Sequence, residues 1–117
     1  MAVFYVSVDG RDASDGSERH PFATLERAVA EAAATGTGFH FHAAEAESDQ
    51  EYNLREHGCR VIERFHRAGV LGPSSLAAHC VHVDGREMDL LAGTGTAVAH
   101  NPQSNLNNAV GIAAIAP

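Results

Sequence analysis

The segment 76–100 reads LAAHCVHVDGREMDLLAGTGTAVAH, and it decides the fold of this chain. Its apolar run LAAHCVHV predicts a strand, and the pair Asp84 and Glu87 has the spacing of a capping box at the start of a helix, EMDLLAG. The stretch TGTAVAH then predicts a second strand. A strand, a helix and another strand with short connections are typical of a parallel sheet.

The same alternation precedes this segment. The compact apolar stretch 38–44 predicts a buried strand, and Ser48 with Glu51 has the capping-box spacing for a following helix that ends before Gly58. A second helix is expected over 60–69. We therefore predict an α/β fold built on a small parallel-sheet βαβαβ domain.

Two further elements precede this domain. Residues 3–10 alternate β-branched and aromatic side chains with smaller ones, which predicts a strand, and residues 24–34 are rich in helix formers. We thus expect an added N-terminal strand and helix over about 1–35, and the βαβαβ segment over 36–117. A chain of 117 residues has room for one good hydrophobic core, so 1–117 is predicted to be a single domain.

Composition excludes several classes of partner. A net charge of −7 repels phosphate backbones, and no basic cluster offsets it, so nucleic acid is not expected to bind. Cys59 and Cys80 form no CxxC pair, which favours a reducing cytoplasm. Since no signal peptide and no apolar stretch near about 18 residues is apparent, we expect a cytoplasmic protein without membrane association.

Histidines mark the carboxyl ends of the three predicted strands. His42, His79 and His100 fall at these ends, where parallel α/β folds gather their ligands, so we expect them at one rim of the sheet. Neutral imidazoles bind zinc or iron, and His42 and His79 are the best candidate ligands. The alternative is that each is a core histidine bonded to backbone. For His100, which precedes Asn-Pro, the alternative is a turn cap.

Glu45 follows His42 by three residues and is the candidate catalytic group. It could act as general acid/base on a water that the metal activates. The competing hypothesis is a solvated carboxylate that complements the dipole of the following helix. His40 shares a face with His42, which permits an H-x-H ligand pair, whereas His82 is expected to be structural because it lies on the face opposite His79.

Three stretches carry a family resemblance. GFHFHAAEAESDQEYNLREHG at 38–58, GPSSLAAHCVHVD at 72–84 and AVAHNPQSNL at 97–106 resemble the metal-dependent aminohydrolases of the amidohydrolase superfamily, the branch of guanine deaminase and triazine chlorohydrolases. The resemblance implies a (β/α)₈ barrel with its metal at the carboxyl ends of the strands. Residues 36–117 would form the part from the fifth to the seventh strand.

The resemblance also implies roles for individual residues. His42 would be the fifth-strand metal ligand, His79 the sixth-strand ligand and Glu45 the acid/base. The metal would be zinc or iron, with a site that holds no metal as the alternative. The implied substrate-binding residues are His100, Asn101 and Asn105.

Two features of the sequence depart from that family. The family has an H-x-H pair on its first strand and an aspartate on its eighth, and neither has a counterpart in this sequence. A whole barrel also takes roughly 250 residues. Residues 3–33 resemble instead the N-terminal cap of right-handed parallel β-helix proteins of the pectate-lyase kind, through the loop DGRDASDG and the stretch PFATLERA. We therefore expect a hybrid or a fragment.

Three functions follow as alternatives. The first is a chimeric or truncated amidohydrolase-derived domain with a partial metal site and little or no hydrolytic activity alone. The second is a structural αβ domain without metal or catalysis, which associates with itself as a homodimer or higher oligomer through exposed sheet edges. The third is an aminohydrolase or deaminase that becomes active when another chain completes it.

Overall fold

A computed structural model describes residues 3–114 of the chain. The chain divides into two compact units, Met1–Thr37 and Gly38–Pro117. Among the residues that the structure describes, no helix is long and apolar enough to cross a membrane.

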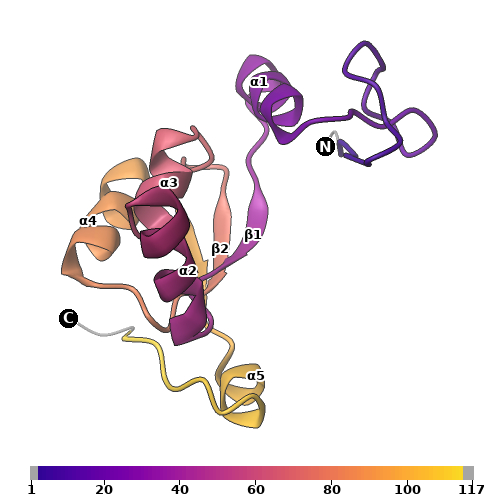
Figure 1. Cartoon of the computed structure of the whole chain (residues 1–117). Helices are drawn as coiled ribbons and strands as arrows, with labels where there is room; N and C mark the ends of the chain where they lie inside the picture. Colours follow the sequence, from indigo (N-terminus) through magenta and orange to yellow (C-terminus); the bar gives the residue numbers. More distant parts are fainter. Residues whose placement is uncertain (1–2, 115–117) are drawn as a thin grey trace. The chain divides into compact units, whose positions relative to one another are not determined.

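The second unit is a three-stranded parallel sheet with helices between its strands (Figure 1). The strand order is β1-β2-β3, with His42 opposite Ala78 and Ala78 opposite Ala99, which confirms the predicted βαβαβ fold. In chain order the elements are β1 (His40–Ala43), α2 (Glu47–His57), α3 (Val61–Arg67), β2 (Leu76–His79), α4 (Gly85–Thr94), β3 (Ala97–Ala99) and α5 (Pro102–Asn107).

Helices α2, α3 and α4 cover one face of this sheet (Figure 1). Ile62 and Leu91 are buried in the core, and the Phe41 ring meets the Phe65 ring edge-on with 4.8 Å between centroids. His40 and His42 are exposed, so the prediction of a buried strand was wrong for two of the four residues of β1. The pleat directs alternate residues to opposite faces, and the helices cover the face of Phe41.

The helix starts confirm one predicted cap and correct the other. Asp84 Oδ1 accepts the N–H of Glu87 at 2.9 Å, while Glu87 Oε2 accepts the N–H of Asp84 at 3.1 Å, so the capping box of α4 is present. The box predicted for Ser48 is wrong, because α2 begins earlier, at Glu47. There Asp49 Oδ2 accepts the N–H of Ala46 at 3.1 Å.

Glu87 does more than cap α4, because its buried carboxylate joins three helices. It is fully buried, and it accepts hydrogen bonds from Arg60 Nε at 2.8 Å and from the backbone N–H of Ile62 at 3.0 Å. Gln50 Nε2 donates to both of its oxygens, at 3.2 and 3.1 Å. The starts of α3 and α4 and the first turn of α2 are thus fixed to one group.

The second strand and the turn after the third differ from prediction. Strand β2 ends at His79 instead of continuing to Val83, because His79 and Cys80 have left-handed backbones with φ of 71° and 48°. Such values break a strand and are costly for residues other than glycine. The segment after His100, predicted to be a turn, forms α5 with Pro102 at its first position.

The first unit contains helix α1 (Leu25–Thr35) and the segment before it. The predicted helix is present, and Thr24 caps it by accepting the N–H of Arg27 at 3.2 Å. The expected strand over 3–10 contributes an isolated parallel bridge between Val6 and Phe22. A ladder does not develop there, because the chain folds back to Phe22 through a long loop that offers a single bridging position.

Candidate metal centre

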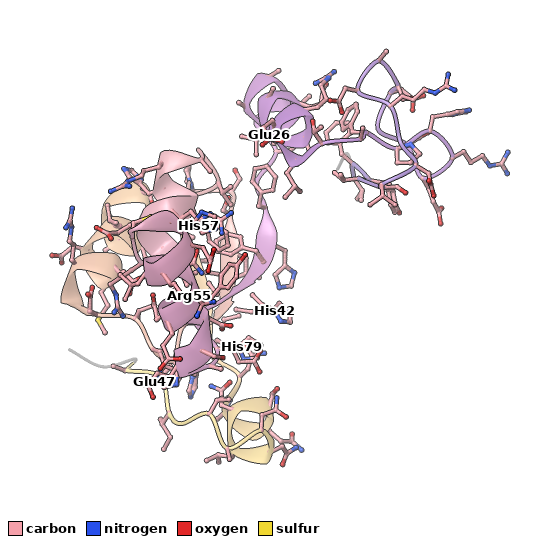
Figure 2. The ribbon with its side chains drawn as sticks, viewed as in Figure 1. Glu26, His42, Glu47, Arg55, His57 and His79 are labelled. Atoms are coloured by element: carbon pink, nitrogen blue, oxygen red, sulfur yellow. The ribbon has the colours of Figure 1, made fainter. Side chains whose placement is uncertain are left out.

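Three of the predicted site residues meet at the carboxyl end of the sheet. His42 lies near the end of β1, Glu45 follows that strand, and His79 ends β2. One ligand atom from each lies within 4.8 Å of the others. Figure 2 shows His42 and His79 next to one another at this end of the sheet. The parallel register of β1 and β2 therefore places these side chains together.

The three side chains are close without bonding to one another. The imidazole rings of His42 and His79 are 4.9 Å apart between centroids, at an angle of 60°. His79 Nε2 lies 3.6 Å from Glu45 Oε2, which is longer than a hydrogen bond. His42 is exposed, whereas His79 is buried. The cluster is thus anchored on one side and open to solvent on the other.

Helix α5 and its C-cap residue, Asn108, contact two members of the cluster. Asn105 Oδ1 lies 2.7 Å from His79 Nδ1, and both residues are buried. Asn108 Nδ2 donates to Glu45 Oε1 at 3.1 Å. Glu45 Oε2 and His79 Nε2 are left facing the space between the three groups.

This donor set fits a divalent metal. Zinc is commonly held by imidazole nitrogens together with a carboxylate oxygen, and catalytic sites use three protein ligands with a further position open to water or substrate. Iron accepts the same kinds of ligand. Since the exposed His42 leaves one side of the cluster accessible, the residues present suit a catalytic type of metal site.

The other candidate residues lie around this cluster. His40 presents its ring 6.3 Å from that of His42 and is not part of the cluster. His100 is also outside it, although it follows β3 at the same edge of the sheet. The predicted structural role of His82 is supported, because its Nε2 bonds to the carbonyl oxygen of Val110 at 2.8 Å.

The predicted substrate residues are notable for unpaired polar atoms. Among residues 3–114, no hydrogen-bond partner is found for three buried atoms: His100 Nδ1, Asn101 Oδ1 and Asn105 Nδ2. Buried polar groups are normally paired, so these atoms suit contact with a bound molecule.

Two contacts made by α5 and its C-cap were not predicted from the sequence. Asn108 was not considered, and Asn105 was assigned to substrate although its carboxamide oxygen contacts His79. The available signal was the segment NPQSN, in which Asn101 and Pro102 suit a helix start.

A parallel βα sheet with candidate site residues at the carboxyl ends of its strands is the arrangement found in part of an α/β barrel. Comparison with known families agrees, since the model described as "Amidohydrolase family" matches residues 15–117. The chain belongs to the amidohydrolase family.

Its relatives of known sequence include several deaminases. The chain is 36% identical over 100 residues to the 5'-deoxyadenosine deaminase of Methanothermobacter thermautotrophicus, covering 82% of this chain and 23% of that protein. It is 39% identical over 95 residues to the 5-methylthioadenosine/S-adenosylhomocysteine deaminase of Desulforudis audaxviator, covering 81% and 22%. The chain thus spans less than a quarter of the length of these two relatives.

Solved structures show the same fold. An adenosine deaminase from Xanthomonas campestris with bound zinc is 25% identical, with a TM-score of 0.71, over 92% of this chain and 22% of that one. The atrazine chlorohydrolase TrzN from Arthrobacter aurescens, complexed with zinc, is 24% identical with the same TM-score of 0.71, over 77% and 20%. The second unit therefore has the fold of part of a (β/α)₈ barrel.

The likeness of residues 3–33 to β-helix proteins finds no support in these comparisons. The family match begins at residue 15 and so includes most of that segment. It also runs through the expected junction near residue 35, where a hybrid would change from one family to the other. The hybrid origin remains a prediction.

Proposed function

We propose that this chain is an amidohydrolase fragment that binds zinc or iron through His42 and His79, with Glu45 as general acid/base. The observation that carries this proposal is the approach of the three ligand atoms to within 4.8 Å of one another. The parallel pairing of β1 and β2 brings the ends of these strands together, and the groups found there, two imidazoles and one carboxylate, are of the kinds that suit zinc chemistry. The zinc bound in two similar solved structures adds support.

The residues around the cluster suit hydrolytic chemistry. When bound, zinc would supply Lewis-acid activation of water near neutral pH. Glu45 would accept a proton at Oε2, since Oε1 is already bonded to Asn108. His79 would bind through Nε2, because its Nδ1 faces Asn105. His42, on the exposed side, would complete the set and border the approach of substrate.

The substrate class proposed is an adenosine derivative that loses its amino group. The relatives named as deaminases of 5'-deoxyadenosine and of 5-methylthioadenosine or S-adenosylhomocysteine support this class. We assign substrate contacts to the residues with unpaired buried atoms, His100, Asn101 and Asn105. This chain alone would hydrolyse little, because the family's first-strand H-x-H pair and eighth-strand aspartate are absent from its sequence.

Self-association is the second proposed function, and it follows from the edges of the sheet. Within the described residues, β1 and β3 each pair with β2 alone, so each leaves one edge of backbone groups free. Such edges pair readily with another strand. A second copy, as a homodimer or higher oligomer, would cover them, and so would the remaining strands of a barrel supplied by another chain.

Zinc titration of the metal-free chain, made without a histidine tag, tests the metal proposal. Competition against a chelating indicator should give about one zinc per chain for the unaltered protein, and His42→Ala should abolish stoichiometric binding. His66→Ala, an exposed histidine on α3, is the matched control and should bind normally. Equal affinity of His42→Ala and His66→Ala would contradict the proposed site.

Two further measurements separate the alternatives. His40→Ala tests the H-x-H pair: unchanged zinc affinity is expected because His40 lies outside the cluster. Light scattering coupled to size-exclusion chromatography tests self-association, and a monomer at every concentration would contradict pairing through the free edges.

A further inference from the structure

We infer that Asn105 is a positioning residue that holds His79 in the tautomer with its proton on Nδ1. The consequence of this inference for metal binding rests on the proposed function, but the tautomer itself does not. A neutral imidazole carries its proton on either ring nitrogen, and the nitrogen without it is the one that can bind a metal. The partner of Nδ1 therefore decides which atom faces the cluster.

The geometry around His79 favours one tautomer. Asn105 Oδ1 lies 2.7 Å from His79 Nδ1, and a carboxamide oxygen only accepts hydrogen bonds. His79 Nδ1 must then donate, which leaves a lone pair on Nε2. The opposite tautomer would set the lone pairs of two atoms against each other at a short distance.

Burial makes this contact decisive. Asn105 is fully buried and His79 is 3% exposed, so water has little access to replace a lost hydrogen bond. An unpaired polar atom in such surroundings carries a substantial free-energy cost. The preference for Nδ1–H should therefore be much stronger than the small tautomer preference of a histidine in water.

His79 needs this external support because its own backbone is unusual. It ends β2 with a left-handed φ of 71°, so its side chain does not continue the regular pleat of the strand. Helix α5, 26 residues further along the chain, supplies the contact that fixes the ring. Asn108, the C-cap of this helix, bonds Glu45, so α5 and its cap together contact two of the three cluster residues.

Nitrogen NMR of the metal-free chain tests the inference. Long-range proton–nitrogen spectra in alkaline buffer, where histidine rings are neutral, report which nitrogen of His79 carries the proton. The unaltered chain should show a protonated Nδ1 and an unprotonated Nε2. A proton on Nε2 would overturn the inference, and because this measurement needs no variant, it decides the matter even if substitutions unfold the chain.

Two substitutions extend the test. Asn105→Asp keeps an oxygen acceptor and should retain the proton on Nδ1, whereas Asn105→Leu removes the acceptor and should move the ring toward the Nε2–H form. Asn107→Leu, an exposed asparagine on the same helix, is the matched control and should leave the tautomer unchanged. An unchanged tautomer in folded Asn105→Leu would contradict the role of Asn105.

Zinc affinity supplies the second readout. Partners that orient a metal-binding histidine typically change affinity by about 10–100-fold, so Asn105→Leu should weaken zinc binding by that factor. Asn105→Asp should retain it. If the NMR result holds and the unaltered chain binds no zinc, the proposed metal function fails while the role of Asn105 in setting the tautomer stands.

Discussion

Replacement of Glu87 by alanine should destabilise the second unit more than any other single change at its polar contacts. The fully buried carboxylate accepts hydrogen bonds from Arg60, Gln50 and two backbone N–H groups, those of Ile62 and Asp84. Truncation removes all of these bonds at once. The starts of α3 and α4 would lose the group that joins them.

The loss in free energy of unfolding depends on which hydrogen-bond donors are left without a partner in Glu87→Ala. Arg60 still pairs with Asp84 at 3.0 Å, and Gln50 Nε2 still donates to the carbonyl of His82 at 3.0 Å. The N–H of Ile62, a fully buried residue, is left unpaired, which costs about 1–3 kcal/mol. Because the charge-assisted hydrogen bond to Arg60 is lost as well, the free energy of unfolding should fall by about 3–5 kcal/mol.

Urea unfolding followed by circular dichroism measures this loss. Domains of this size typically have a stability of about 5–15 kcal/mol, so Glu87→Ala should unfold at a much lower urea concentration. Arg86→Ala is the matched control on the same helix, because the Arg86 side chain is 77% exposed and its ion pair with Glu63 should contribute about 1 kcal/mol or less. A loss for Glu87→Ala no larger than that of Arg86→Ala would refute the reasoning.

Three further predictions concern single groups. Burial, together with the charge of Glu87, raises the pKa of the Cys80 thiol from 9.0 to about 11, so the folded state holds this proton to higher pH than the unfolded state does. The free energy of unfolding should therefore fall by about 1–3 kcal/mol as the pH rises from 9 to 11. Urea midpoints across this pH range should show the decline in the unaltered chain and not in Cys80→Ala; a decline in both would contradict the assignment. The hydrogen bonds of Thr24 and Ala23 to Asp12 lower the pKa of that carboxyl below 3.8. The carbon NMR shift of this carboxyl should therefore titrate with a midpoint below pH 3.8, and a midpoint above that value would count against these bonds. Ala109→Gly should raise the melting temperature, because Ala109 has a left-handed φ of 53° that costs alanine about 1 kcal/mol; a lowered melting temperature would contradict this.

The fold could be predicted from the sequence because its signals are local. The capping box of Asp84 and Glu87 and the stop at Gly58 both lie where the pattern placed them, since each depends on residues within one helical turn. Strand β2 was predicted too long because the left-handed backbone at His79 is set by its surroundings and not by its residue type.

The candidate site was predictable to the extent that strand ends converge. His42, Glu45 and His79 come together because β1 and β2 are parallel neighbours, which the alternation of strands and helices indicated. The contact between Asn105 and His79, and the hydrogen bonds of Glu87 with Gln50 and Arg60, join residues far apart in the chain. No local pattern specifies such packing contacts.

Anomalous diffraction at the zinc edge, from crystals grown with one equivalent of zinc, tests the central claim most directly. We expect a single strong peak bonded to His42 and His79, with zinc–nitrogen distances of about 2.0–2.1 Å, and with Glu45 beside it. A peak at other histidines, such as His57 or His66, with none between these three residues, would contradict it.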